Sequence, residues 1–90
     1  MVFEWDEAKR LSNLEKHGLD FADADLIFEG SYLDVEATAT GIEARRKAIG
    51  LIHGRCVAFI YTERGSVIRC ISLRRARINE RRHHQALFGG

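Results

Sequence analysis

The sequence predicts one α+β domain over residues 1–90, with two N-terminal helices packed on an antiparallel sheet of about four strands and a further helix at the C-terminus. Three observations predict this arrangement. Apolar residues recur at helical spacing between residues 6 and 30, and three apolar runs separated by short turns follow between residues 44 and 73. The last segment is charged and has only a weak apolar stripe, which is typical of a surface helix.

The first third of the chain predicts a short strand and two helices. Val2–Trp5 alternates apolar and polar residues, as a half-buried strand does. Asp6 is a good N-cap and Gly18 follows two basic residues that suit the end of a helix, so a helix is expected over 6–17. A second, shorter helix is expected between Asp20 and Gly30.

The middle of the chain predicts a meander of strands. The expected strands are Tyr32–Glu36, Ala44–Ile52, Arg55–Thr62 and Ser66–Leu73. Their connections are the loop Ala37–Gly41 and the turns His53-Gly54 and Glu63-Arg64-Gly65, and the terminal helix is expected from Arg74 onward. Gly50, Gly54 and Gly65 are interpreted as turn glycines, because they fit no phosphate-binding motif.

The two cysteines are expected to be reduced and buried. Cys56 and Cys70 both lie in apolar runs and form no CxxC motif. A two-residue turn at Arg64-Gly65 would put Cys56 opposite Leu73, and a three-residue loop would put it opposite Ser72. Neither register pairs the two cysteines, so no disulfide is predicted.

The net charge of +1 conceals an unequal distribution of charge. Residues 1–43 carry eleven acidic and three basic residues, a balance of −8, whereas residues 44–90 carry eleven basic and two acidic residues, a balance of +9. Ten of those eleven bases are arginine, whose planar fork matches a phosphate group. The basic half therefore either faces a polyanion or pairs with the acidic half across the fold.

Several function classes find no support in the sequence. None of the four histidines stands at a zinc-motif spacing from another ligand, so neither a metal site nor a cofactor is expected. Walker, dinucleotide-binding and Gly-x-Ser-x-Gly motifs are also missing. The N-terminus does not have the pattern of a signal peptide, and no apolar run approaches the roughly 20 residues of a membrane span. A cytoplasmic location with no membrane partner is therefore expected.

The remaining chemistry depends on arginines placed on ordered elements. Arg69 interrupts an apolar strand, Arg64 lies at a hairpin tip, and Arg74 follows the strand of Arg69. Together with Arg45 or Arg46 on a neighbouring strand, they are expected to lie toward one surface and to grip a phosphodiester. RNA supplies its own nucleophile, the 2′-hydroxyl, so the protein needs a general base and a general acid. The candidates for these two roles are His17, Glu63, Glu80 and His84. These observations alone predict an anion-binding α+β domain.

Three stretches of the chain, in the same order, resemble the BrnT family of type II toxins. They are Phe3-Glu4-Trp5-Asp6-Glu7-Ala8-Lys9, continuing through Asn13 and Lys16-His17-Gly18 to Phe21; Arg45 with Ala48-Ile49-Gly50 and Gly54-Arg55; and Tyr61-Thr62-Glu63-Arg64-Gly65 with Ile68-Arg69, Ile71–Ala76 and Glu80-Arg81. The chain departs from the family at Ser66, where an aspartate is usual, and at His84, where a tyrosine is frequent.

The resemblance implies a RelE-like fold and a ribonuclease that arrests growth by cutting RNA. It also implies a cognate BrnA-like antitoxin with a ribbon-helix-helix DNA-binding domain. That antitoxin would neutralise the toxin, and the complex would contact operator DNA only through the antitoxin. Dimerisation of the toxin within this complex is a further expectation.

The resemblance also directs attention to particular residues, to which we assign roles. Those expected at the scissile phosphate are Arg64, Arg69 and Arg74, and those expected to transfer protons are His17 and Glu63. Those expected to contact the rest of the RNA are Lys16, Arg45, Arg81 and His84. The alternative is a non-catalytic module, a degenerate paralogue that holds RNA or an acidic antitoxin segment without cutting.

Overall fold

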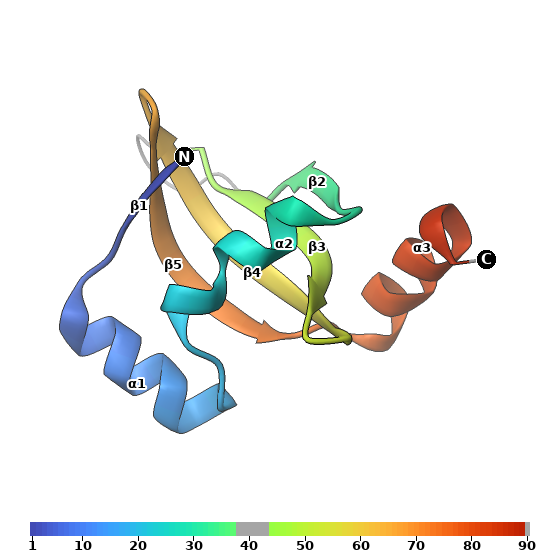
Figure 1. Ribbon diagram of the computed structural model, residues 1–90, viewed down its shortest axis with the longest axis horizontal. Coiled ribbons are helices and arrows are strands. Elements are labelled where there is room, and N and C mark those ends of the chain that lie inside the picture. The colour runs from blue at the N-terminus through green and yellow to red at the C-terminus, as the bar shows by residue number, and fades with distance from the viewer. Residues whose placement is uncertain (38–43, 90) are drawn as a thin grey trace.

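The computed structural model describes residues 1–37 and 44–89 (Figure 1). In chain order the elements are β1 (Val2–Glu4), α1 (Glu7–His17), the 3₁₀ turn η1 (Phe21–Asp23), α2 (Asp25–Glu29), β2 (Leu33–Glu36), β3 (Arg46–Ile52), β4 (Arg55–Arg64), β5 (Val67–Arg75) and α3 (Ile78–Phe88). These elements confirm the α+β class. The loop predicted over Ala37–Gly41 lies outside the described residues from residue 38 onward. Within the described ranges, no helix has the length and apolar content needed to cross a membrane.

The strands form one mixed sheet in the order β1-β5-β4-β3-β2. The pairs β2–β3, β3–β4 and β4–β5 are antiparallel, which confirms the predicted meander. The expectation of a wholly antiparallel sheet is wrong, because β1 joins the edge of the sheet parallel to β5. This pairing places the ring of Phe3 6.0 Å from that of Phe28 and 6.4 Å from that of Phe59, so the added strand extends the aromatic core.

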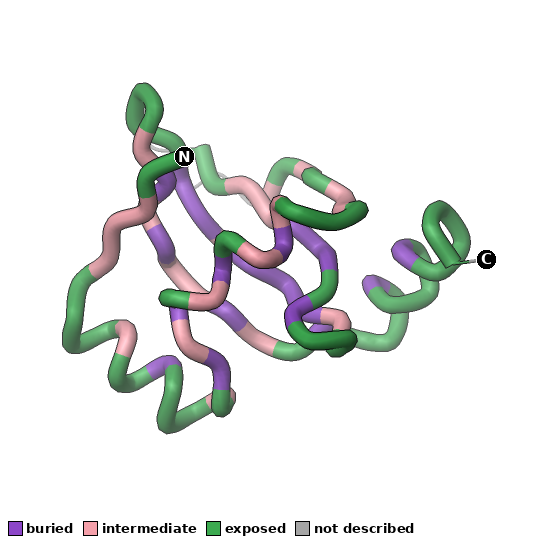
Figure 2. Tube along the Cα trace, viewed as in Figure 1, coloured by how far each residue is buried: buried purple, intermediate pink, exposed green. Residues whose placement is uncertain are grey.

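The segment η1–α2 covers one face of the sheet and encloses the apolar core. Phe21 and Ile27 are buried there against Phe59 of β4, and Figure 2 shows the buried segments in α2 and along the central strands. The helix predicted between Asp20 and Gly30 is interrupted, because the Ala24 N–H bonds the Phe21 carbonyl at 3.0 Å and closes a 3₁₀ turn before α2 begins.

Gly50 lies in the middle of β3. The interpretation of Gly50 as a turn glycine is therefore wrong. A Cβ atom at this position would lie 2.7 Å from Cγ2 of Ile27 and 3.1 Å from Cβ of Tyr32. Glycine therefore allows α2 to approach the sheet closely at this point.

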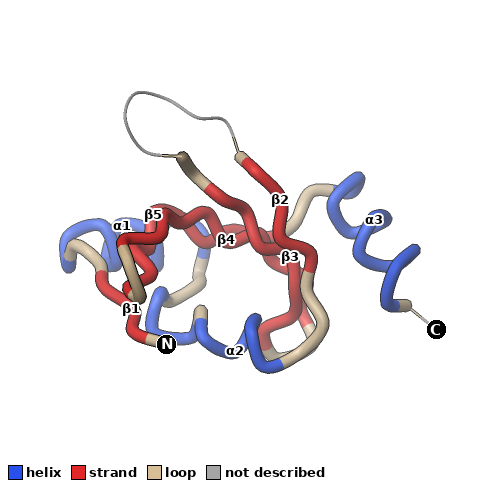
Figure 3. Tube along the Cα trace, turned by 90° about the horizontal axis from the view of Figure 1, so that it is seen from above, coloured by secondary structure: helices blue, strands red, loops and turns tan. Residues whose placement is uncertain are grey.

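Helix α1 lies along the free edge of β5 and not over the face that α2 covers (Figure 3). β1 pairs only with Val67–Arg69, so the rest of that edge has no partner strand. Asn13, the one buried residue of α1, occupies this edge. Its Nδ2 donates to the carbonyls of Leu73 at 2.8 Å and Leu19 at 3.1 Å, and its Oδ1 accepts from the Leu73 N–H at 3.1 Å. The expectation that both N-terminal helices pack on one face is therefore wrong for α1.

The hairpin between β4 and β5 is longer than predicted. Its turn is Gly65-Ser66, because Arg64 still pairs with Val67, and Gly65 adopts a φ of +60° that suits glycine. β5 then continues to Arg75, so Arg74 belongs to a strand and not to the terminal helix. The longer hairpin therefore includes Arg64, Arg69 and Arg74 in the backbone pairing of β4 with β5.

Both cysteines are free thiols, as predicted, but Cys56 is only partly buried, and its strand register differs from the two that were expected. Cys56 lies beside Ala76, whose N–H donates to its carbonyl at 3.0 Å, and not opposite Leu73 or Ser72. Cys70 pairs with a different part of β4 and is buried in the core. The shifted turn and the extra residue Ile71 on β5 together account for the difference in register.

Helix α3 is tied to the sheet through one buried carboxylate. The side chain of Glu80 is 5% exposed and accepts from the Arg74 guanidinium at 2.8 and 3.1 Å and from the Lys47 ammonium at 2.7 Å. It also accepts from the Arg77 N–H at 2.8 Å, which caps the start of the helix. The Arg74 hydrogen bond, followed by those of Lys47 and Arg77, lowers the pKa of Glu80 to about 2 against the opposing effect of burial.

We expect Gly50→Ala to lower the free energy of unfolding by about 1–3 kcal/mol, because the added Cβ forces Ile27 and α2 outward. Urea unfolding followed by circular dichroism measures this change. Gly30→Ala is the matched control, since a Cβ there meets nothing within 4 Å and its φ of −112° suits alanine. A Gly50 variant as stable as this control would contradict the close packing of α2.

We expect Glu80→Gln to lower the free energy of unfolding by about 3 kcal/mol at neutral pH, because the Arg74 and Lys47 cations then lose their shared partner. In the wild type, the lowered pKa of Glu80 means that its ionised carboxylate stabilises the fold fully at pH values above 4.5, the ordinary pKa of the group. This stability is lost as the pH falls toward 2. The variant should therefore lose less stability than the wild type across this pH range. Urea titrations across the range test this, with the exposed Glu15→Gln as control. Identical pH profiles for Glu80→Gln and the wild type would exclude the buried ion pair.

Candidate functional site

Helix α1 presents a polar side to the free edge of β5. Lys9, Ser12 and Lys16 recur at spacings of three and four residues, so they share one side of the helix with Asn13. His17 completes this side at the last residue of α1. Lys16 and His17 lie in the last turn, where positive charge complements the helix dipole.

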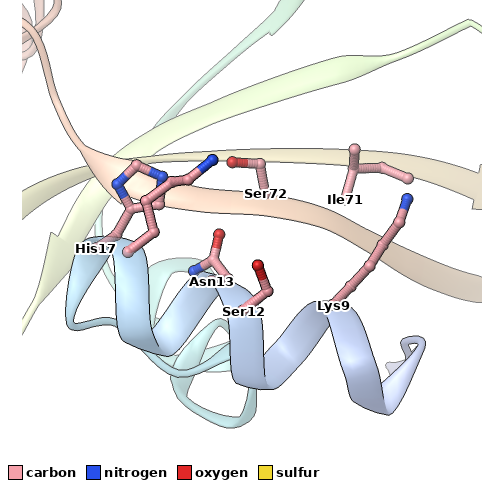
Figure 4. A pocket seen from close by; sticks show the side chains of 7 residues that line it. Lys9, Ser12, Asn13, His17, Ile71 and Ser72 are labelled. Atoms are coloured by element: carbon pink, nitrogen blue, oxygen red, sulfur yellow. The ribbon is translucent and has the colours of Figure 1, made fainter.

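A pocket of about 210 Å³ separates this side of α1 from β5, and we call it the α1 pocket. Its lining consists of Lys9, Ser12, Asn13, Lys16 and His17 from α1 and Ile71 and Ser72 from β5. In Figure 4 the side chains of Lys9, Ser12 and His17 rise from the helix toward the strand, and Ser72 faces them. No carboxylate is among the lining residues. Two ammonium groups, an imidazole and two hydroxyls therefore surround a space suited to an anion.

A β-bulge places Arg69 and Arg74 on the same face of the sheet. Arg69 pairs with Thr62 and Arg74 with Ala58, and these two partners share one face of β4 because their separation is even. In a regular strand, residues five apart would point to opposite faces. The extra residue Ile71 lies between them, where the pairing shifts, and restores the common face.

Arg64 and Ser72 lie on this same face, which we call the arginine face. Arg64 stands two residues beyond Thr62 on β4, and Ser72 pairs with Ile60 of the same alternating set. Ser72 therefore belongs to both the α1 pocket and the arginine face. The structure thus brings the predicted residues Arg64, Arg69 and Arg74 to one surface, beside the pocket that holds Lys16 and His17.

The arginines on this face differ in how far they are neutralised. Arg74 is 19% exposed and fixed by Glu80, so its charge is largely compensated. Arg69 is 32% exposed and lies 3.5 Å from a carboxylate oxygen of Glu4, a looser ion pair at the surface. Arg69 is therefore the more accessible cation of the two.

Two of the predicted site residues, Glu63 and Arg45, do not lie on the arginine face. Glu63 pairs with the core residue Ile68, so it lies on the opposite face of the sheet from Arg64. Arg45 is exposed immediately before β3, where its carbonyl accepts from the Ala37 N–H at 2.8 Å. Its neighbour Arg46 lies on the core face and donates to Asp34 at 3.0 Å, so it does not join the other arginines.

Two further predicted residues lie on α3. His84 is buried, and its Nε2 is 3.1 Å from the Ser31 carbonyl oxygen, so this side chain fixes the helix to the start of β2. Arg81 is exposed beside Cys56, outside the α1 pocket. The structure therefore does not bring either residue to the α1 pocket.

The sequence prediction did not include Lys9, Ser12 or Ser72. The helical spacing of Lys9 and Ser12 relative to Lys16 is a signal that the sequence contains. Ser72 could not be identified in this way, because its orientation depends on the bulge at Ile71. In the described part of the chain, no three His, Cys, Asp or Glu side chains converge in an arrangement that could hold a metal ion.

The family comparison covers the elements that build this site. A family model described as the ribonuclease toxin BrnT of type II toxin–antitoxin systems matches residues 5–80, which include α1, β5 and Glu80. No curated protein and no solved structure matches the chain significantly. The family match covers well over half of the 90 residues. The chain therefore belongs to the BrnT family of ribonuclease toxins of type II toxin–antitoxin systems.

Proposed function

We propose that this chain is the toxin of its own toxin–antitoxin pair and that it cuts RNA, without a metal ion, at the α1 pocket. The observation that carries the proposal is the convergence of two lysines, a histidine and two serines around a pocket lined by no carboxylate. Membership of the BrnT family supplies the ribonuclease class. Because the substrate is RNA, the proposed place of action is the cytoplasm.

In the proposed reaction the RNA supplies its own nucleophile. The 2′-hydroxyl gives its proton to a general base, and its oxygen attacks the neighbouring phosphorus. The 5′-oxygen of the next nucleotide then leaves with a proton from a general acid, which yields a 2′,3′-cyclic phosphate and a 5′-hydroxyl. His17 is assigned one of these two proton transfers, because imidazole changes its charge near neutral pH and His17 is the histidine that lines the pocket.

The cations around the pocket have distinct proposed roles. Lys9 and Lys16 stabilise the charge that builds on the phosphoryl oxygens. Arg64, Arg69 and Arg74 hold phosphates along the arginine face, with Arg74 oriented by Glu80. Arg45 and Arg81 extend the RNA track at its two ends. The proposal assigns no proton transfer to Glu63 or His84, since one lies on the opposite face and the other is buried.

The proposed partner is a BrnA-like antitoxin with a ribbon-helix-helix domain. It would neutralise the toxin and would bring the complex to operator DNA without direct contact between this chain and the DNA. An acidic antitoxin segment laid over the arginine face would compete with RNA for the same cations, because both carry negative charge.

We expect the purified protein to cleave RNA in the presence of EDTA and to leave cyclic phosphate ends. His17→Ala should lower the cleavage rate by about 10²–10⁴-fold, because a proton-transfer group is lost. Lys16→Ala should lower it by about 10²-fold, because a cation at the developing charge is lost. Gel analysis of an end-labelled RNA measures both the rate and the chemistry of the ends.

His83→Ala and Arg82→Ala serve as controls, since both residues are exposed on α3 and do not line the α1 pocket. Thermal unfolding of each variant establishes that the fold is intact. Intact RNA at high concentrations of wild-type protein would contradict the proposal and favour the alternative of a non-catalytic binding module.

A further inference from the structure

A second basic region lies where the end of the sheet meets α3. A cavity of about 240 Å³ is lined by Arg55, Cys56, Arg75 and Arg81. A cavity of about 420 Å³ beside it shares Cys56 and Arg81 and continues along α3 to Phe88. We call the two together the α3 groove. None of the lining residues belongs to the α1 pocket.

One end of the α3 groove concentrates positive charge. Arg55, Arg75 and Arg81 come from β4, β5 and α3 and are all exposed. Within residues 1–37 and 44–89, none of the three guanidinium groups has a carboxylate within ion-pair distance, in contrast to Arg46 and Arg74. Three converging like charges repel one another unless an anion is bound between them, and guanidinium forks match phosphate oxygens.

The other end of the α3 groove is apolar and aromatic. Leu51 and Phe88 line it and are 45% and 43% exposed, which leaves two large apolar side chains in water. The Phe88 ring packs against His84, with the two ring centroids 5.0 Å apart, and His84 itself contacts the Ser31 carbonyl. The amide of Gln85 adds N–H donors and a carbonyl acceptor to this end of the groove. An exposed ring beside an amide is suited to stacking and hydrogen bonding of a nucleobase.

The thiol between the two ends adds no charge. Burial raises the pKa of Cys56, so its side chain is neutral where the two cavities meet. A ligand that places an anion at the arginines and a flat ring at Phe88 therefore meets no opposing charge.

We infer that the α3 groove binds one nucleotide of the RNA strand, with its phosphate at Arg55, Arg75 and Arg81 and its base against Phe88 and Leu51. The inference rests on the proposed function, because the RNA is the substrate assigned to the α1 pocket. Ser72 of that pocket and Arg75 of the groove lie three residues apart on β5, roughly 10 Å along the strand, and on opposite faces of the sheet. One RNA strand that occupies both places therefore passes around the end of the sheet, and the groove would add base preference at a distance from the cut.

The test is the binding of a short, uncleavable 2′-O-methyl oligonucleotide, followed by fluorescence anisotropy at several salt concentrations. Arg75→Ala should weaken binding and reduce the slope of log K against log salt by about 0.7, because one phosphate contact is lost. Phe88→Ala should weaken binding by about 5- to 150-fold, because a base loses its stacking partner. The same Phe88 variant should bind an abasic oligonucleotide as the wild type does.

The matched controls are Arg82→Ala and Leu87→Ala, which are exposed neighbours on α3 that line neither cavity. Groove variants that bind RNA like these controls would overturn the inference, even if cleavage at the α1 pocket is normal. A loss of affinity for the antitoxin with unchanged affinity for RNA would also overturn it and make the groove a protein-docking site. If the groove variants bind weakly as predicted but the wild type does not cleave RNA, the ribonuclease proposal fails and the groove inference stands.

Discussion

Asn13 is the one buried side chain of α1, and its amide bonds both the N–H and the carbonyl of Leu73 on β5. The apolar residues of the helix do little to hold it, since Leu11 and Leu14 are exposed. Without Asn13, the two Leu73 groups would lose their partners, at a cost of about 1–3 kcal/mol for each that stays buried. The α1 pocket depends on this amide, because the same side of the helix carries Lys9, Lys16 and His17.

Ion pairs within the fold account for part of the unequal charge distribution. Arg46 and Arg69 of the basic half pair with Asp34 and Glu4 of the acidic half, and Lys47 and Arg74 share Glu80. Several other cations have no carboxylate partner within the described residues, and five of them gather in two places. These are Lys9 and Lys16 in the α1 pocket and Arg55, Arg75 and Arg81 in the α3 groove. Internal pairing therefore uses part of the positive charge, and part of the remainder lies at these two concave surfaces.

Local sequence signals predicted the bounds of α1 and the antiparallel meander, because capping residues and alternation act over a few positions. They could not predict the bulge at Ile71, which depends on how β4 and β5 pair, and so they could not show that Ser72 joins the site. The role of Gly50 was also hidden, since it depends on contact with Ile27 in α2. Glu63 was misplaced because adjacent strand residues face opposite sides.

RNA is proposed to bind where α1 meets the free edge of β5. The most direct test is an NMR titration of the protein with an uncleavable 2′-O-methyl RNA, with backbone amides and the His17 ring followed together. We expect the largest shifts to include Lys9, Lys16, His17 and Ser72, which line the α1 pocket. Saturated RNA binding with these resonances unmoved would contradict binding at the α1 pocket and place the RNA on another surface.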